Sequence, residues 1–208
     1  MKNIVPAFMV LVLILNACSH SKSVESQKCE KIYKHSVSLI NDYYTTNDKE
    51  YLNKAQQTLD SITCCNELKD KIINTQISLF FLSKNYDRGI IYIDSIPLNY
   101  FKKSYQKTMY LDCLKALKSK NVEHDTIQSV RYYTKIVNSI NEYLYKNPND
   151  EDALLDYFIT KINIAPKDEI LNEIDKVMEL KPDKRDFFEA LKETIQSLEA
   201  QNNLQSVE

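Results

Sequence analysis

The chain has 208 residues, of which 43% are hydrophobic and 27% are charged, and its formal net charge is −2. This balance suits one globular domain or one short repeat array, and the near-neutral charge indicates neither a nucleic-acid-binding surface nor a basic membrane-binding one. A single glycine and five prolines leave few residues for β-hairpin turns or phosphate-binding loops, so we expect a helical protein.

An apolar segment opens the chain and ends at a cysteine. Lys2 precedes a run of apolar and proline residues over positions 4–15, which spans about 18 Å as a helix. A bilayer core of about 30 Å needs roughly 20 such residues. We therefore interpret residues 1–17 as a cleaved signal peptide and not as a membrane span.

The end of this segment, Leu15-Asn16-Ala17-Cys18, resembles the lipobox of bacterial lipoproteins. The resemblance implies that Cys18 carries a diacylglycerol and an acyl chain such as palmitate, a combination that makes a stable membrane anchor. Ser19 stands where lipoproteins retained at the inner membrane carry aspartate, so the resemblance also implies a periplasm-facing position at the bacterial outer membrane. The alternative is an ordinary secretory signal in which Cys18 is incidental.

The polar stretch that follows Cys18 has no hydrophobic periodicity. We expect residues 18–28 to form the lipidated cysteine and a flexible tether, whose ten residues beyond the cysteine reach about 17 to 19 Å. Residues 29–201 are expected to form one helical domain, and residues 202–208 a disordered tail. The helices of that domain are expected near residues 32–43, 52–62, 68–83, 86–96, 102–118, 125–146, 150–164, 167–180 and 183–200.

Several apolar positions recur at a spacing of 34 residues. Ala55, Leu59 and Ile62 are followed 34 residues later by Gly89, Ile93 and Ile96. The same spacing relates a second set, in which Ile136, Ile140, Tyr143 and Pro148 are followed by Ile170, Ile174, Val177 and Pro182.

A 34-residue helix-turn-helix period resembles the tetratricopeptide repeat. The resemblance implies an all-α fold of antiparallel helix pairs stacked as a short α-solenoid. The sequence departs from the family in two ways. Ile136 and Ile170 occupy a position that holds a small residue in the family. The spacing of 47 residues between Gly89 and Ile136 indicates an insertion near 97–125. An irregular helical bundle is the alternative fold.

In the repeat family, partners bind along a concave wall made by the first helix of each pair. Matching positions one by one gives eight candidates for partner contact, none of which is a catalytic residue. They are Tyr44, Asn74, Ser78, Phe81, Asp152, Leu155, Ile159 and Asn163.

Four cysteines remain besides Cys18, and disulfides are permitted in an exported protein. Cys29 opens the first expected helix, while Cys64 and Cys65 follow the second, and antiparallel packing brings those ends together. We expect Cys29 to pair with either Cys64 or Cys65, closing a loop of about 35 residues, and Cys113 to stay free. There is no C-x-x-C spacing, so we expect no metal site.

No motif for catalysis is present. The three histidines, His20, His35 and His124, lie in no recognisable protease or metalloprotease pattern, and the glycine-poor chain has no phosphate-binding loop. We therefore expect no enzyme activity and no cofactor beyond the lipid on Cys18, with an enzyme as the outsider.

Two functions fit these observations. The first is a membrane-anchored helical-repeat lipoprotein that acts as a protein-protein interaction scaffold in the cell envelope. The second is an immunity-type lipoprotein that neutralises a toxin, for which the fourteen tyrosines are suitable contact residues. Both imply a protein partner and the membrane, and neither involves nucleic acid; the oligomeric state stays open.

Overall fold

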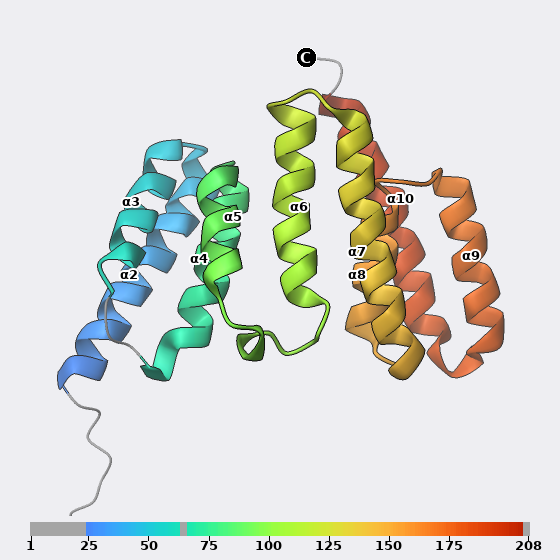
Figure 1. Ribbon diagram of the computed structural model, residues 1–208, viewed down its shortest axis with the longest axis horizontal. Coiled ribbons are helices and arrows are strands. Elements are labelled where there is room, and N and C mark those ends of the chain that lie inside the picture. Colours follow the sequence, from blue (N-terminus) through green and yellow to red (C-terminus); the bar gives the residue numbers. More distant parts are fainter. Residues whose placement is uncertain (1–23, 63–65, 206–208) are drawn as a thin grey trace, which may run out of the picture. The chain divides into compact units, whose positions relative to one another are not determined.

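The computed structural model describes residues 24–62 and 66–205, and all regular elements in this part of the chain are helices (Figure 1). The prediction of an all-α fold in which neighbouring helices pack is therefore confirmed for these residues. Contacts divide the chain into two units, Met1–Ser83 and Lys84–Glu208. The division falls between the helix that ends at Leu82 and the helix that begins at Tyr86, and each unit is described by itself below.

The described residues of the first unit, 24–62 and 66–83, form three α-helices and one short 3-10 turn. Helix α2 packs along α3, and α3 packs against α4. Asp48 is the N-cap of α3, because its carboxylate accepts a hydrogen bond of 2.9 Å from the backbone N–H of Glu50. Leu52, Ala55 and Leu59, all at most 1% exposed, form the centre of the core. The elements are α2 (Val24–Thr46), α3 (Lys49–Asp60), η1 (Asn66–Leu68) and α4 (Lys69–Leu82).

In the second unit, residues 84–205 are described and form six α-helices. Helix α6 packs between α5 and α7, α7 packs against α8, and α9 packs against α10. Figure 1 shows α6 and α7 side by side and antiparallel. The elements are α5 (Tyr86–Ser95), η2 (Leu98–Tyr100), α6 (Gln106–Asn121), α7 (Thr126–Lys146), α8 (Glu151–Lys161), α9 (Lys167–Leu180), η3 (Pro182–Lys184) and α10 (Arg185–Gln205).

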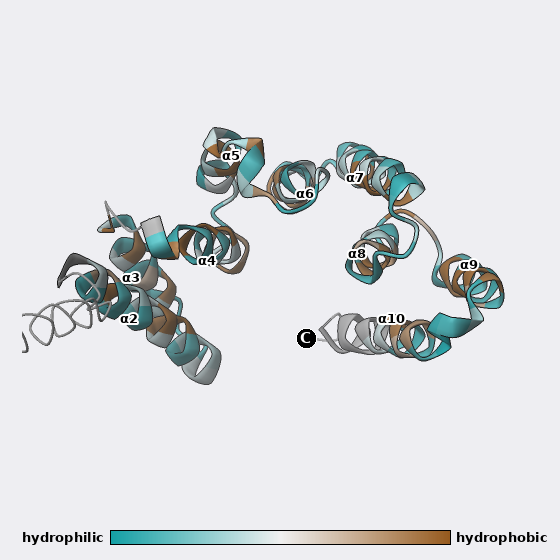
Figure 2. Cartoon of the chain, turned by 90° about the horizontal axis from the view of Figure 1, so that it is seen from below, coloured by the Kyte–Doolittle hydropathy of each residue, from teal (hydrophilic) through white to brown (hydrophobic). Residues whose placement is uncertain are grey.

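The core of the second unit uses the positions that recur in the sequence. Ile136, Ile140, Ile170 and Ile174 are each 0% exposed and belong to one hydrophobic cluster with residues of α8 and α10. The helices accordingly carry hydrophobic residues on one side and hydrophilic residues on the other (Figure 2). Removing these large side chains from water is what stabilises the packing of short helices that are marginal in isolation.

Among the described residues, three other than glycine adopt left-handed backbone conformations next to helix ends. Asn47 (φ 57°), Lys84 (φ 55°) and His124 (φ 56°) follow α2, α4 and α6 closely. Glycine is the usual residue in this conformation, because a Cβ atom is crowded there. The chain has one glycine in total, Gly89, and it lies inside α5.

The structure changes two of the expected boundaries. Helix α2 begins at Val24, so residues 24–28 are helical and not part of a tether; α10 runs to Gln205, past the expected start of the tail at residue 202. No glycine or proline interrupts either stretch, which explains why the helices continue. The expected insertion near 97–125 holds η2, a linker and α6, which is packed on both sides by its neighbours in sequence.

None of the helices in the described part of the chain is both long and apolar enough to cross a membrane. The predicted signal peptide, the predicted lipidation site Cys18, and Cys64 and Cys65 lie outside the described residues.

Candidate functional site

The four predicted contact residues of the first unit lie on α2 and α4. Tyr44 is 67% exposed in the last turn of α2, with its ring 5.6 Å from that of Tyr43 in a tilted arrangement. Asn74 and Ser78 are exposed one turn apart on α4, whereas Phe81 is partly buried. Three of the four side chains are therefore available to a partner in this unit.

The other four lie on α8 and the turn after it. Leu155 is 39% exposed, and Asp152 and Asn163 are also exposed, but Ile159 is partly buried against the hydrophobic cluster. The amide of Asn163 donates a hydrogen bond of 3.1 Å to the backbone carbonyl of Thr160, which fixes the turn. Ile159 thus contributes to packing more than to an exposed wall.

A polar cluster joins α8 to the linker before α6. The ammonium group of Lys103 lies 2.6 Å from the Asp150 carboxylate and 3.0 Å from that of Asp152. Asp150 also accepts hydrogen bonds from the Tyr143 hydroxyl at 2.9 Å and from the backbone N–H of Ala153 at 3.1 Å, which makes it the N-cap of α8. Burial raises the pKa of Asp150, but the hydrogen bonds from Lys103, Ala153 and Tyr143 outweigh it and hold that pKa below its usual range.

A second contact of the same linker is buried. Tyr105 is 1% exposed, and its hydroxyl donates a hydrogen bond of 2.6 Å to the carboxylate of Asp156 on α8. Its ring meets that of Tyr143 edge-on at 5.1 Å. Burial raises the pKa of Asp156 and of Tyr105 alike, so both groups favour their neutral forms more than they would in water.

A buried charge lies between α6 and α7. Asp112 is 0% exposed and forms ion pairs with Lys135 at 2.8 Å and with Lys115 at 3.5 Å. Neither of its oxygens has a hydrogen bond of normal geometry within the described residues, so these two ammonium groups compensate its charge. The neighbouring Cys113 is a free thiol, and burial raises its pKa to about 12.

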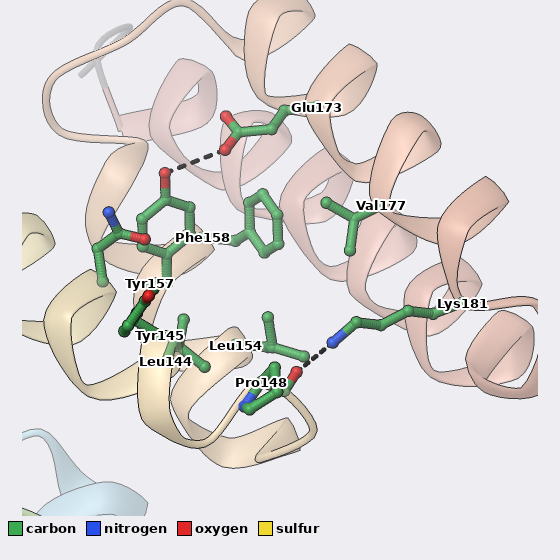
Figure 3. Close-up of a pocket in the computed structure, with 10 residues that line it drawn as sticks. Leu144, Tyr145, Pro148, Leu154, Tyr157, Phe158, Glu173, Val177 and Lys181 are labelled. Atoms are coloured by element: carbon green, nitrogen blue, oxygen red, sulfur yellow. Dashed lines mark hydrogen bonds between the residues drawn. The ribbon is translucent and has the colours of Figure 1, made fainter.

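An open pocket of about 290 Å³ lies between α7, α8 and α9 (Figure 3). Its apolar walls come from all three helices, and Tyr145, which is 89% exposed, stands at its edge. The lining residues are Asn141, Leu144, Tyr145, Pro148, Leu154, Tyr157, Phe158, Glu173, Val177 and Lys181.

The charged side chains around this pocket form hydrogen bonds and ion pairs with other groups of the same chain. Glu173 accepts a hydrogen bond of 3.0 Å from the Tyr157 hydroxyl and pairs with the ammonium group of Lys161. Lys181 donates to the backbone carbonyl of Pro148 and, at 3.3 Å, to the side chain of Asn149. Figure 3 shows both polar contacts at the margin, with apolar side chains between them, so the pocket suits an apolar side chain and not a charged one.

Cys29 is buried at 8% exposure and is disulfide-bonded. Cys113 is free, so it is not the partner of Cys29. The three other cysteines, Cys18, Cys64 and Cys65, lie outside the described residues. The pairing of Cys29 with Cys64 or Cys65 stays a prediction.

These sites differ in how visible they are in the sequence. The pocket depends on three helices meeting, and the bonds of Lys103 and Tyr105 to α8 join residues about 50 positions apart, so no local pattern indicates either. No group of three or more histidine, cysteine or acidic side chains within the described ranges is placed to hold a metal ion.

Comparison of the chain with family models, with curated proteins and with solved structures gives no match.

Proposed function

We propose that this protein is a lipid-anchored helical-repeat lipoprotein that acts as a protein-protein interaction scaffold in the bacterial cell envelope. The lipobox-like Leu15-Asn16-Ala17-Cys18 supports the anchoring part of the proposal, with the lipid on Cys18 and a periplasm-facing position at the outer membrane. The described helices support the part that concerns binding.

One observation carries that part: helices α4 and α5 have the same pattern of burial as helices α8 and α9, at a constant spacing of 81 residues. Ile77 on α4 corresponds to Phe158 on α8, at 3% and 1% exposure. Ile93 on α5 corresponds to Ile174 on α9, and both are 0% exposed. Gly89 and Ile170 are buried at a further equivalent position. Such correspondence is expected when the same helix-turn-helix pattern recurs along a chain, as it does in repeat proteins.

The same spacing relates two exposed positions in the first helices. Asn74 on α4 and Leu155 on α8 are exposed at equivalent places, although each lies beside a buried residue, Ile73 or Leu154. Uncharged side chains kept in solvent at matching positions are suitable contacts for a protein partner. The proposal assigns this role to the exposed predicted residues and a packing role to Ile159.

Affinity capture of the tagged full chain from detergent-solubilised membranes tests the proposal. The wild-type protein is expected to enrich one or more envelope proteins, and Leu155→Asp to reduce the yield by about tenfold or more, a loss of about 1.4 kcal/mol. Glu169→Arg on α9, an exposed charge outside the predicted wall, is the matched control and should leave the yield unchanged.

Two results would overturn the scaffold role. One is capture of the same proteins at the same yield by wild type and Leu155→Asp, which would remove the wall from the binding surface. The other is capture of a single toxin in stoichiometric amount, which would establish the immunity function instead.

A further inference from the structure

We infer that the protein forms a homodimer in which the exposed face of α7 packs antiparallel against the same face of a second copy. This inference concerns a surface outside the predicted wall, and it does not depend on the lipid anchor. It rests on how apolar and charged residues are arranged along this one helix.

A line of uncharged side chains runs along the exposed face of α7, with the exposed charged residues Arg131, Lys135 and Glu142 along one edge of it. At 100° per residue, Ile127, Thr134, Asn138 and Tyr145 lie within about 40° of one line along the helix. All four are exposed, with Ile127 at 69% and Tyr145 at 89%. In a chain with 27% charged residues, an uncharged line of this length is a candidate contact surface.

The two ends of this face have complementary shapes. At the start of α7, Ile127 and Val130 project into solvent at 69% and 41% exposure. At the other end, Asn141 and Tyr145 belong to the same face and line the apolar pocket between α7, α8 and α9. The projecting apolar end and the hollow apolar end are about 27 Å apart, five helical turns.

These features are symmetric about residue 136. Ile127 and Tyr145 each lie nine residues from it, and Thr134 and Asn138 each lie two. A two-fold axis through this point places the projecting end of one copy at the hollow of the other, twice, as an isologous interface requires.

Two of the charges on the edge of the face fit the same symmetry, and a third, Lys135, pairs with Asp112 within its own copy. Arg131 and Glu142 lie five and six residues from position 136, on one side of the uncharged line. Both are exposed; Arg131 has only a hydrogen bond of 3.4 Å to Gln128, and Glu142 has no partner among the described residues. In the antiparallel dimer Arg131 of each copy faces Glu142 of the other, giving two reciprocal ion pairs.

The size of the surface sets the expected affinity. A helix face about 27 Å long and about 10 Å wide offers roughly 270 Å² per copy, well below the roughly 800 Å² of a standard interface. The two contacts at the pocket add to this area, so the dimer belongs to the weak class, with a dissociation constant of roughly 1 to 100 μM.

Sedimentation velocity on the full chain in a nonionic detergent tests the inference. Wild type is expected to shift from monomer to dimer as the protein concentration rises through this range. Ile127→Asp should abolish the dimer, and Arg131→Glu or Glu142→Arg alone should each weaken it about tenfold or more, about 1.4 kcal/mol. The double variant Arg131→Glu/Glu142→Arg restores both reciprocal pairs and should return the dissociation constant to within about threefold of wild type.

Ile91→Asp on α5 is the matched control, since Ile91 is 72% exposed and lies away from the face. It should dimerise as wild type does, and circular dichroism of each variant checks that the helices are retained. A wild-type protein that stays monomeric, an Ile127→Asp variant that still dimerises, or a double variant as weak as the single ones would each overturn the inference.

Discussion

Asp150 combines a helix cap with two tertiary contacts, whereas Asp125 at the start of α7 is a cap alone. Asp125 accepts a hydrogen bond of 2.8 Å from the backbone N–H of Gln128, and Asp150 additionally binds Lys103 and Tyr143. We expect Asp125→Ala to lower the free energy of unfolding by about 1 kcal/mol, and Asp150→Ala to lower it more, by about 2 kcal/mol. Urea unfolding at neutral pH compares the two variants; equal losses would mean that Lys103 and Tyr143 add nothing.

The lowered pKa of Asp150 also gives a pH dependence with a definite sign. A carboxyl group whose folded pKa is depressed contributes stability that is fully present above its ordinary pKa of about 4 and is lost as pH falls through the lowered folded value. The difference in stability between wild type and Asp150→Asn should therefore be constant above about pH 5 and shrink below pH 4. A difference that grows on acidification would contradict this assignment.

Cys113 provides a second test at the scale of one residue. Because burial raises its pKa to about 12, almost none of the thiol is ionised at pH 8, and the thiolate is the reactive form. We expect iodoacetamide at pH 8 to leave the peptide that contains Cys113 unmodified in the native protein and to label it fully in urea, as measured by mass mapping. Rapid labelling of the native protein would show that this part of α6 is accessible.

At the scale of the helices, the shortage of glycine has a cost that can be measured. Lys84 follows α4 with a φ of 55°, where a residue with a Cβ atom is disfavoured by about 1 to 2 kcal/mol. We expect Lys84→Gly to raise the free energy of unfolding by about 0.5 to 1 kcal/mol, after the entropy that glycine gains in the unfolded chain is subtracted. Lys84→Ala keeps the Cβ atom and should change stability little; a gain from alanine equal to that from glycine would assign the effect to the lysine charge instead.

Most helices were predictable because their signals are local. An N-cap or a proline acts on the neighbouring turn only. The structure has helix boundaries close to the N-caps Asp48, Asp125 and Asp150 and close to Pro97 and Pro166. The ends at Val24 and Gln205 were missed because no cap, glycine or proline marks them, and a polar helix at a terminus reads like an irregular segment.

At the scale of the whole molecule, the sequence predicts burial better than it predicts sites. Ile136, Ile140, Ile170 and Ile174 were found by their 34-residue recurrence, and all four are fully buried. The pocket and the bonds from Lys103 and Tyr105 to α8 were not found, since they depend on how a linker and three helices meet. Spacing along one chain carries no information about such contacts unless the exact packing is known.

The proposed function also depends on where the molecule is held. A helical protein tied to a membrane meets its partners at that surface, whereas an untethered one is diluted through the compartment, so the anchor changes the effective concentration of every binding surface described above. The proposal places the anchor on Cys18, which lies outside the described helices.

The most direct measurement is therefore membrane fractionation of cells that express the full chain, combined with intact mass analysis. We predict that the wild-type protein sediments with membranes and carries a diacylglycerol and an acyl chain on Cys18, whereas Cys18→Ser is released to the soluble fraction. Cys113→Ala, which removes a cysteine from the helical core, should stay with the membranes. If Cys18→Ser sediments with membranes as wild type does, or if the mature wild-type protein carries no lipid, the account of a lipid-anchored scaffold is contradicted.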